Sequence, residues 1–160
     1  TYRVLTPTQA KRIGGTYTDE EFDLTRLRDI RSQMVEVGRS CVHPDYRTGG
    51  VILSLWRALT QFMRSNNLHI MIGCGTIPLR RTSIHNEPFG GDIAASVWAK
   101  VESTRLAPIE RRVIPRTPLP LERFAVDSTI EAPALINAYF RMGAKVMGPP
   151  AWDADFNVAW

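Results

Sequence analysis

The strongest constraint on the fold is a strand pattern that passes through two glycines into a helix pattern. Residues 33–44, QMVEVGRSCVHP, carry β-branched and apolar side chains up to a proline, which predicts a long strand that ends there. After the glycines at positions 49 and 50, apolar residues recur at helical spacing over residues 51–63, and this helix is expected to end near residues 65–67. A strand that leads into a helix in this way is typical of α/β folds.

Strand and helix patterns alternate along the rest of the chain as well. Strands are predicted at residues 1–6, 68–77 and 144–148, and helices at residues 18–30, 90–103 and 131–143. The first of these helices starts with Thr18 and Glu21 at the spacing of a capping box. Apolar residues alternate again in the final segment, as at the start of a last strand. We therefore expect one α/β domain over residues 1–160, cut from a longer protein at both ends.

The composition narrows the functions that the chain can have. A formal net charge of +4 favours an acidic partner, such as nucleic acid, an anionic membrane or a carrier protein, with an ordinary soluble surface as the simpler alternative. No apolar run reaches the roughly 18 residues that predict a membrane-spanning helix. Cys41 and Cys74 lie in apolar strand patterns and are expected to be reduced, buried thiols of a cytosolic protein. The histidines and cysteines lack metal-ligand spacing, so no metal site is expected.

The turn between the predicted strand and helix has the features of a phosphate site. The first backbone N–H groups of a helix have no partner within the helix and carry the positive end of its dipole. Glycine lets a ligand approach that backbone closely, and Arg47 adds a charged donor. A tight turn with a solvated arginine explains the same residues, so both interpretations stay open on this pattern alone.

The segment VHPDYRTGGVI, residues 42–52, resembles the acyl-CoA-binding signature of the GNAT acyltransferase superfamily. Arg47 and Gly50 match the first arginine and the glycine of that signature, whereas Ile52 stands in place of its final small residue. The resemblance implies that this loop holds the phosphate of a pantetheine arm. The residues implied are Val42, Arg47, Thr48, Gly49, Gly50, Val51 and Ile52.

Motifs spread along the chain resemble most closely the ornithine-lipid N-acyltransferases, a family that includes long-chain N-acyl amino acid synthases and "hemolysin-like" acyltransferases. The motifs are EVGRSCVHPDYRTG at 36–49, LW at 55–56, GC at 73–74, PALINAYFRMGA at 133–144 and WDADF at 152–156. This resemblance implies a GNAT-like fold, with a central mixed sheet flanked by helices. It also implies that the first strand, the first helices and the final strand of that fold are missing from the chain.

The same resemblance implies an enzyme of bacterial lipid metabolism. A long-chain fatty acyl group, in some cases 3-hydroxylated, would pass directly from the thioester of acyl carrier protein or CoA to the amine of an amino acid. No covalent enzyme intermediate and no permanently bound cofactor are expected. Ornithine is the first expected acceptor, and the product is an N-acyl amino acid or lyso-ornithine lipid. The enzyme is expected in the cytoplasm, with peripheral contact to the inner membrane as an alternative.

Three residues are candidates for the chemistry. Glu36 is a lone carboxylate in an apolar strand, and resemblance to the Glu-x-x-Arg of acyl-homoserine lactone synthases, completed by Arg39, implies a general base. A salt-bridged surface glutamate is the alternative. Glu36 and Arg39 face opposite sides of a regular strand, so a shared site requires a β-bulge between Val37 and Ser40. The resemblance implies Tyr139 as the acid that protonates the leaving thiolate, and the alternative is a tyrosine packed on the core.

A proline-rich and arginine-rich segment at residues 105–123 is the expected docking surface for an acidic acyl carrier protein. The candidate contacts are Arg111, Arg112 and Arg116. A solvated loop, or contact with anionic lipid headgroups, explains the segment nearly as well. Asp153 and Asp155 are candidates for holding a second ammonium group of the acceptor, with loop solvation as the favoured alternative.

Two other classes of function stay open on the sequence. One is an enzyme similar to the acyl-homoserine lactone synthases, which shares the donor and differs in the acceptor. The other is a non-catalytic module that binds a carrier protein or nucleic acid through its basic surface. No basic run interleaved with aromatic residues supports nucleic acid, so nucleic acid is not expected as a partner.

Overall fold

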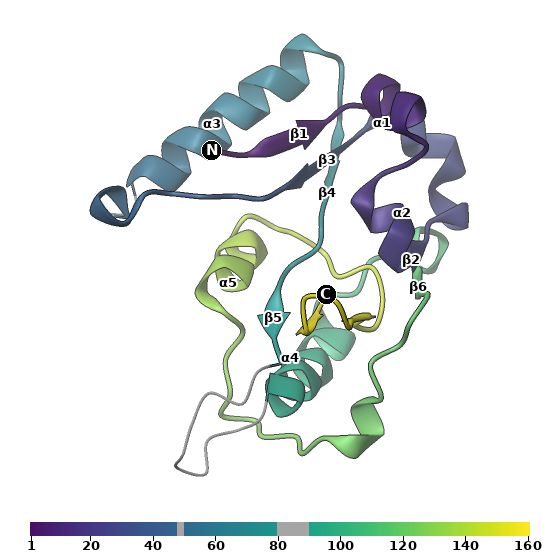
Figure 1. Cartoon of the computed structure of the whole chain (residues 1–160), viewed down its shortest axis with the longest axis vertical. Helices are drawn as coiled ribbons and strands as arrows, with labels where there is room; N and C mark the ends of the chain where they lie inside the picture. Colours follow the sequence, from purple (N-terminus) through teal and green to yellow (C-terminus); the bar gives the residue numbers. More distant parts are fainter. Residues whose placement is uncertain (48–49, 80–89) are drawn as a thin grey trace. The chain divides into compact units, whose positions relative to one another are not determined.

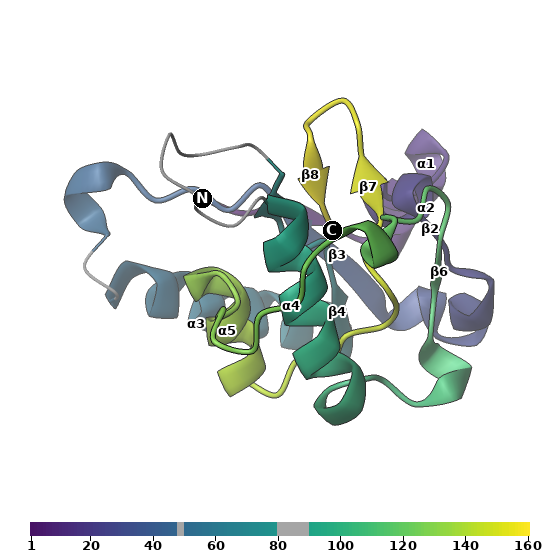
Figure 2. The same cartoon turned by 90° about the horizontal axis from the view of Figure 1, so that it is seen from below.

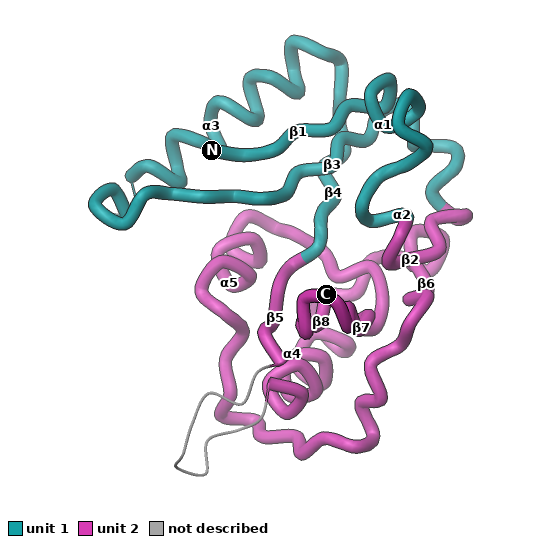
Figure 3. Tube along the Cα trace, viewed as in Figure 1, with its two compact units in different colours: residues 1–19, 27–74 teal, residues 20–26, 75–160 magenta. Residues whose placement is uncertain are grey.

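The chain forms a mixed α/β structure in a computed structural model (Figure 1). The structure describes residues 1–47, 50–79 and 90–160. The α/β class predicted from the alternating patterns is therefore confirmed. The chain divides into two compact units (Figure 3). Unit 1 comprises residues 1–19 and 27–74, and unit 2 comprises residues 20–26 and 75–160.

Unit 1 is built on a three-stranded sheet with β3 at its centre. The strands are β1 (Arg3–Leu5), β3 (Met34–Gly38) and β4 (Ile70–Ile72). β1 pairs antiparallel to β3 and β4 pairs parallel to it, so the sheet is mixed. The register places Leu5 and Ile72 opposite Glu36, and these three side chains therefore lie on one face of the sheet.

The helix α3 (Gly50–Ser65) covers the other face of this sheet, over the residues that its apolar spacing predicted. Met63 of α3 packs with Val35 and Leu68, and Val4 of β1 completes the cluster. Figure 1 shows α3 running alongside β1 and β3. Because Val35 precedes Glu36 in the strand, the helix and the carboxylate lie on opposite faces of the sheet.

A short helix that the sequence analysis did not predict follows β1. In α1 (Pro7–Ile13), Thr6 and Gln9 form a complete capping box, and the proline stands in the first turn. Its C-cap residue Gly14 has φ 91°, a left-handed conformation that glycine adopts without strain. These signals are all local, and they stand in the segment TPTQAKRIGG.

The helix predicted from Thr18 is wrong in its start and in its length. α2 (Tyr17–Glu21) starts after Thr16, whose hydroxyl accepts the Asp19 N–H at 3.2 Å, while Asp19 accepts the Thr16 N–H at 2.9 Å. The capping box therefore lies two residues earlier than predicted. The next elements are β2 (Phe22–Asp23) and a 3₁₀-helix (Thr25–Gln33). Phe22 and Leu24 are both buried, and this spacing of two suits a strand better than a helix.

Unit 2 packs the helix α4 (Gly90–Thr104), which the sequence predicted, against short strands (Figure 2). Val97 and Val101 of α4 are buried with Ile77 and Ala159 in the core of this unit. One antiparallel sheet contains β5 (Ile77–Pro78), β8 (Val158–Ala159) and β7 (Trp152–Asp153) in that order. A second sheet pairs β2 with β6 (Ile114–Pro115).

The remaining elements of unit 2 are mostly short. The helix α5 (Ala134–Arg141) follows Pro133 and ends before Gly143, as its sequence predicted. The arginine-rich segment contains two 3₁₀ turns, at Ile109–Arg111 and Leu121–Arg123. In place of the predicted strand at 144–148, the structure has an isolated β-bridge between Val146 and Leu106.

Several strands are shorter than their sequence patterns predicted. The predicted strand at 68–77 is divided between β4 and β5, which belong to different sheets. The alternation near residue 160 belongs to a hairpin of β7 and β8 rather than to one strand. In the described part of the chain, the strands form three small sheets, whereas the resemblance implied one central sheet.

The predicted burial of the two cysteines is wrong for Cys41. Cys41 is exposed, because β3 ends at Gly38 and the chain beyond it is no longer part of the buried sheet. Cys74 is half-buried, directly after β4. No helix among the described residues is long and apolar enough to cross a membrane.

Candidate active site

Glu36 is a buried carboxylate at the centre of the unit 1 sheet. Its side chain belongs to the central strand β3, and the residue is only 3% exposed. An ionised carboxylate in such a position is stable only when charged or polar groups compensate the lost hydration. The partners of Glu36 therefore determine what this carboxylate can do.

Arg3 and Thr18 supply this compensation. Arg3 Nη2 donates to Glu36 Oε1 at 2.9 Å, and the Arg3 side chain itself is partly exposed. The backbone N–H and the hydroxyl of Thr18 both donate to Glu36 Oε2, at 2.7 Å and 2.8 Å. The charge of Glu36 is thus balanced, and its position is fixed by two elements, β1 and the start of α2.

One acceptor position of the carboxylate is left over. A carboxylate can accept about four hydrogen bonds, two on each oxygen. Within residues 1–47, 50–79 and 90–160, Glu36 accepts three, and Oε1 accepts only the one from Arg3. Glu36 is also one of the residues that line a pocket on its face of the sheet.

A thiol adjoins the same network. Cys74 Sγ lies 3.9 Å from Thr18 Oγ1, and Thr18 Oγ1 in turn donates to Glu36. Cys74 has the same strand parity as Ile72, which lies opposite Glu36. The thiol therefore lies beside the site, one hydroxyl away from the carboxylate.

A β-bulge is present between Gly38 and Cys41, one residue later than the predicted position between Val37 and Ser40. The β1–β3 register pairs Arg3 with Gly38, but Thr1 exchanges backbone hydrogen bonds in both directions with Cys41. Two residues, Arg39 and Ser40, thus lie opposite the single residue between Thr1 and Arg3, which defines a bulge. Arg39 adopts φ 48°, a left-handed conformation that is uncommon for a residue with a side chain.

The cation that pairs with Glu36 is Arg3 rather than Arg39. Arg39 is exposed, and it makes no hydrogen bond or ion pair with the residues that the structure describes. Arg3 lies diagonally across the strand pair from Glu36, on the same face of the sheet. Gly38, directly opposite Arg3, adds no side chain between the two charged groups.

The candidate phosphate loop lies at the start of α3. Arg47 is exposed and donates from Nε to the carbonyl of Val42 at 3.0 Å. Gly50 is the first residue of α3, and Val51 and Ile52 are half-buried in its first turn. Thr48 and Gly49 lie outside the described residues.

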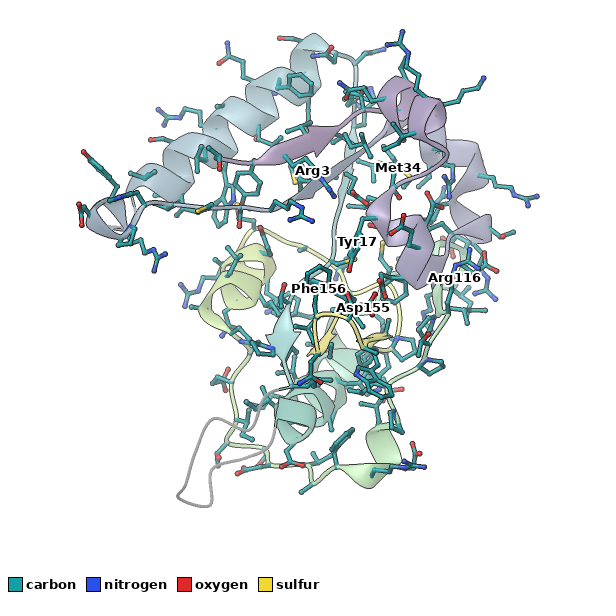
Figure 4. All side chains as sticks on the ribbon, in the orientation of Figure 1. Arg3, Tyr17, Met34, Arg116, Asp155 and Phe156 are labelled. Atoms are coloured by element: carbon teal, nitrogen blue, oxygen red, sulfur yellow. The ribbon has the colours of Figure 1, made fainter. Side chains whose placement is uncertain are left out.

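Two further candidates belong to unit 2. Tyr139 is half-buried on α5. Asp153 is buried, and its two oxygens accept the Phe156 N–H at 3.0 Å and the Trp160 indole N–H at 3.2 Å. Asp153 therefore holds the β7–β8 hairpin together instead of being solvated in a loop, while the exposed Asp155 lies in the turn between these strands (Figure 4).

The sequence analysis missed Arg3 and Thr18. A signal for Arg3 was present, because it is a lone cation in a strand pattern that precedes a lone carboxylate in another strand. Thr18 was interpreted as a helix cap, and its true contact is with a residue 18 positions away. A contact between residues so far apart in the sequence depends on the tertiary fold, and no local sequence pattern predicts it.

An ion pair between Asp19 and Arg31 borders the site. Arg31 Nη1 donates to Asp19 Oδ2 at 3.1 Å, and Arg31 Nη2 contacts the other carboxylate oxygen. Partial burial acts to raise the pKa of Asp19, but hydrogen bonds from Arg31 and Thr16 outweigh burial, so the pKa lies below its ordinary value. The same bond raises the pKa of Arg31.

This lowered pKa predicts a pH-dependent contribution to stability. A carboxylate with a lowered pKa stabilises the fold above its unfolded pKa, and the contribution is lost as the pH falls through the folded pKa. Asp19→Asn is expected to cost about 1 kcal/mol of unfolding free energy at neutral pH, a small value because the pair is partly exposed to solvent. The cost should be smaller at an acidic pH than at neutral pH, because the contribution is lost as the pH falls through the lowered pKa of Asp19. Urea unfolding at both pH values checks this, with the exposed Asp155→Asn as control; an equal cost at both would contradict it.

Comparison with known proteins adds the family context. Residues 1–57 match the family model described as an acetyltransferase (GNAT) domain. The matched segment contains Arg3, Thr18 and Glu36, together with the loop that precedes α3. The network around Glu36 therefore lies mostly within the part of the chain that this family model recognises.

Several curated proteins named L-ornithine N(alpha)-acyltransferase are similar to the chain. The protein from Rhodobacter capsulatus is 35% identical over 164 residues, which cover 98% of this chain and 59% of that relative. The protein from Rhizobium meliloti is 31% identical, covering 91% of this chain and 50% of the relative. The protein from Agrobacterium fabrum is 29% identical, and the match covers 98% of this chain and 54% of the relative. The chain thus spans little more than half the length of these relatives, and no solved structure matches it.

Proposed function

We propose that this chain is an N-acyltransferase of the GNAT superfamily that acylates an amino acid, as its similarity to the GNAT family model and to the L-ornithine N(alpha)-acyltransferases supports. The acyl group is a long-chain fatty acyl group, 3-hydroxylated in some substrates, and it arrives as a thioester of acyl carrier protein or CoA. The acceptor is the α-amine of ornithine, which the names of the similar proteins support. The product is N-acylornithine, a lyso-ornithine lipid. Residues 1–160 act as one acyltransferase domain of a cytoplasmic enzyme, with peripheral contact to the inner membrane as the alternative.

The observation that carries this proposal is the buried carboxylate of Glu36, clamped by Arg3 and Thr18 and open on one lone pair of Oε1. In the reaction, the neutral amine nitrogen attacks the thioester carbonyl carbon, the C–N bond forms, and the C–S bond breaks. Glu36 takes the proton from the nitrogen, directly or through a water molecule, and its charge stabilises the positive nitrogen in the transition state. The thiolate leaves and takes up a proton.

Other candidates complete this proposed machinery. Tyr139 is assigned the role of acid toward the leaving thiolate, because a phenol can donate its proton as the C–S bond breaks. Arg39, held at the bulge, is assigned to the thioester side of the site, where a positive charge favours the oxyanion. The residues assigned to the pantetheine phosphate are Val42, Arg47, Thr48, Gly49, Gly50, Val51 and Ile52.

The assignment of the phosphate loop predicts a defect in donor binding. Arg47→Ala should raise the KM for the acyl donor by about 10- to 100-fold, the equivalent of the roughly 1.5–3 kcal/mol of a hydrogen bond to a charged group. The fold should be unaffected, because Arg47 is exposed. Steady-state kinetics with the full-length protein and a fixed acceptor concentration measure this effect. If the folded variant has an unchanged KM for the donor, Arg47 does not bind the donor and its assignment is rejected.

We further propose that acyl carrier protein is the physiological donor and that it docks on Arg111, Arg112 and Arg116. The segment that carries these residues is anchored, since Arg112 Nε donates to the Ala107 carbonyl at 3.0 Å and Arg26 donates to the Ile109 carbonyl at 2.9 Å. An anchored cationic segment keeps its charges in place for an acidic partner, which speeds encounter.

This docking surface predicts a donor-specific loss. Arg111→Ala combined with Arg112→Ala should lower kcat/KM for acyl carrier protein donors by about tenfold at low salt, and less at high salt, where screening weakens steering. Turnover of acyl-CoA, which needs no protein docking, should stay nearly unchanged. Urea unfolding controls for the lost bond between Arg112 and Ala107. An equal loss of kcat/KM with both donors, or no loss with either, would show that the carrier protein does not dock on this segment.

A further inference from the structure

A pocket of about 530 Å³ lies on the Glu36 face of the unit 1 sheet. All of its walls belong to unit 1, and Met34, one of the lining residues of β3, is labelled in Figure 4. Leu5, Met34 and Ile72 supply the apolar part of the lining from the three strands. Lys11 of α1 and Arg31 supply cations. Glu36 is the carboxylate of this lining, and it is nine-tenths buried or more.

The charges around the pocket leave one cation without an ion pair. Arg31 is engaged by Asp19, and Arg3 is engaged by Glu36. Lys11 is exposed and forms no ion pair with any residue in the described ranges. The pocket therefore offers a ligand an unpaired ammonium group from one helix and a buried acceptor oxygen of Glu36 from the sheet.

We infer that this pocket holds the amino-acid acceptor, and that Lys11 binds its carboxylate while the reacting amine faces Glu36. This inference rests on the proposed function and names the acceptor site for it. An α-amino acid carries an anionic group and an amine a few atoms apart, which matches the two kinds of polar group that the pocket presents. The apolar residues between them suit the carbon chain of the amino acid.

The arrangement also gives a reason for specificity. A plain amine offers no anionic group to Lys11, so it forgoes the ion pair that an amino acid forms there, while the exposed ammonium of Lys11 stays hydrated. The resulting preference for amino acids comes from this added ion pair and not from the burial of an unpaired charge. Lys11 is thus a specificity-determining residue for amino acids over simple amines.

Lys11→Met tests this inference in the full-length protein, with L-ornithine and with putrescine, which is ornithine without its carboxylate. Wild-type protein should prefer ornithine, and Lys11→Met should raise the KM for ornithine by about fivefold, the effect of losing a solvent-exposed ion pair. The KM for putrescine and the KM for the acyl donor should stay unchanged. Lys145→Met, the same substitution at an exposed position in unit 2 that does not line the pocket, is the matched control.

Equilibrium binding of L-ornithine by calorimetry provides a second readout, in which Lys11→Met should weaken binding by the same factor. An active wild type whose ornithine KM and ornithine affinity do not respond to Lys11→Met overturns the acceptor assignment and leaves the proposed function intact. A variant that changes only the donor KM shows that the pocket serves the acyl chain, and it overturns the assignment as well. A folded wild type that acylates neither compound rejects the proposed function itself.

Discussion

Replacing Glu36 with glutamine is expected to lower kcat at neutral pH by about 100-fold or more, the usual worth of a positioned general base. Glutamine keeps the shape of the side chain and loses the group that takes the proton. Raising the pH should restore part of the rate, because a larger fraction of the acceptor amine is then neutral without help from the enzyme. Initial rates at saturating donor and acceptor, measured across a pH series with the full-length protein, give the result.

Two controls separate this catalytic loss from a folding defect. The side-chain amide of the Glu36→Gln variant has one acceptor oxygen for donors on both sides, from Arg3 and Thr18, so the variant should also lose about 1–3 kcal/mol of stability. Rates must therefore be measured well below its unfolding temperature. Glu20→Gln makes the same substitution at an exposed residue and should keep the wild-type rate. A folded Glu36→Gln protein with wild-type kcat at neutral pH rules out the base.

Gly73→Ala is expected to lower the free energy of unfolding by about 2–3 kcal/mol, because it overpacks the backbone beside the site. A Cβ at position 73 would lie 2.4 Å from the carbonyl oxygen of Val37. That atom is backbone of the central strand, so it can move away only if β3 shifts next to Glu36. The variant should therefore lose activity as well as stability. Urea unfolding monitored by circular dichroism measures the loss.

Gly38→Ala is the matched control for this prediction. It introduces the same methyl group into the same sheet, where the nearest atom is the end of the flexible Arg3 side chain at 3.7 Å. Its stability is expected to stay within about 1 kcal/mol of wild type, since alanine also removes some of the backbone freedom of glycine in the unfolded chain. Equal stability of Gly73→Ala and Gly38→Ala would mean that the chain at residue 73 does not approach β3 as closely as described.

The sequence predicted the parts of the fold that depend on local patterns. The helix α3 followed from the apolar spacing of residues 51–63, and the bulge followed from the parity of Glu36 and Arg39. The unpredicted helix α1 also had local signals, in Thr6, Gln9 and Gly14, but its short length gave no apolar periodicity. These signals are sufficient to find such a helix when capping residues are searched directly.

The set of residues that form the site was less predictable, because it depends on strand register and on long-range contacts. Glu36 was identified from its isolation in an apolar strand, but its partners Arg3 and Thr18 are 33 and 18 positions away. Arg3 reaches Glu36 only because the antiparallel register places both residues on one face of the sheet. A shift of one residue would have put Arg3 on the opposite face. Lys11 also lines the pocket only because of the tertiary fold, and it belongs to a helix that the sequence analysis did not predict.

Mass spectrometry of lipids from cells that express the full-length protein tests the central claim most directly, because it identifies both substrates at once. Cells with the wild-type protein should accumulate N-acylornithine with a long acyl chain, and cells with Glu36→Gln, expressed at the same level, should contain little or none. The masses of the fragments name the amino acid and the length and hydroxylation of the chain. Detection of acyl chains on another amino acid would change the proposed acceptor and leave the proposed reaction unchanged. The absence of any new N-acyl amino acid from cells that contain the folded wild-type protein would contradict the account.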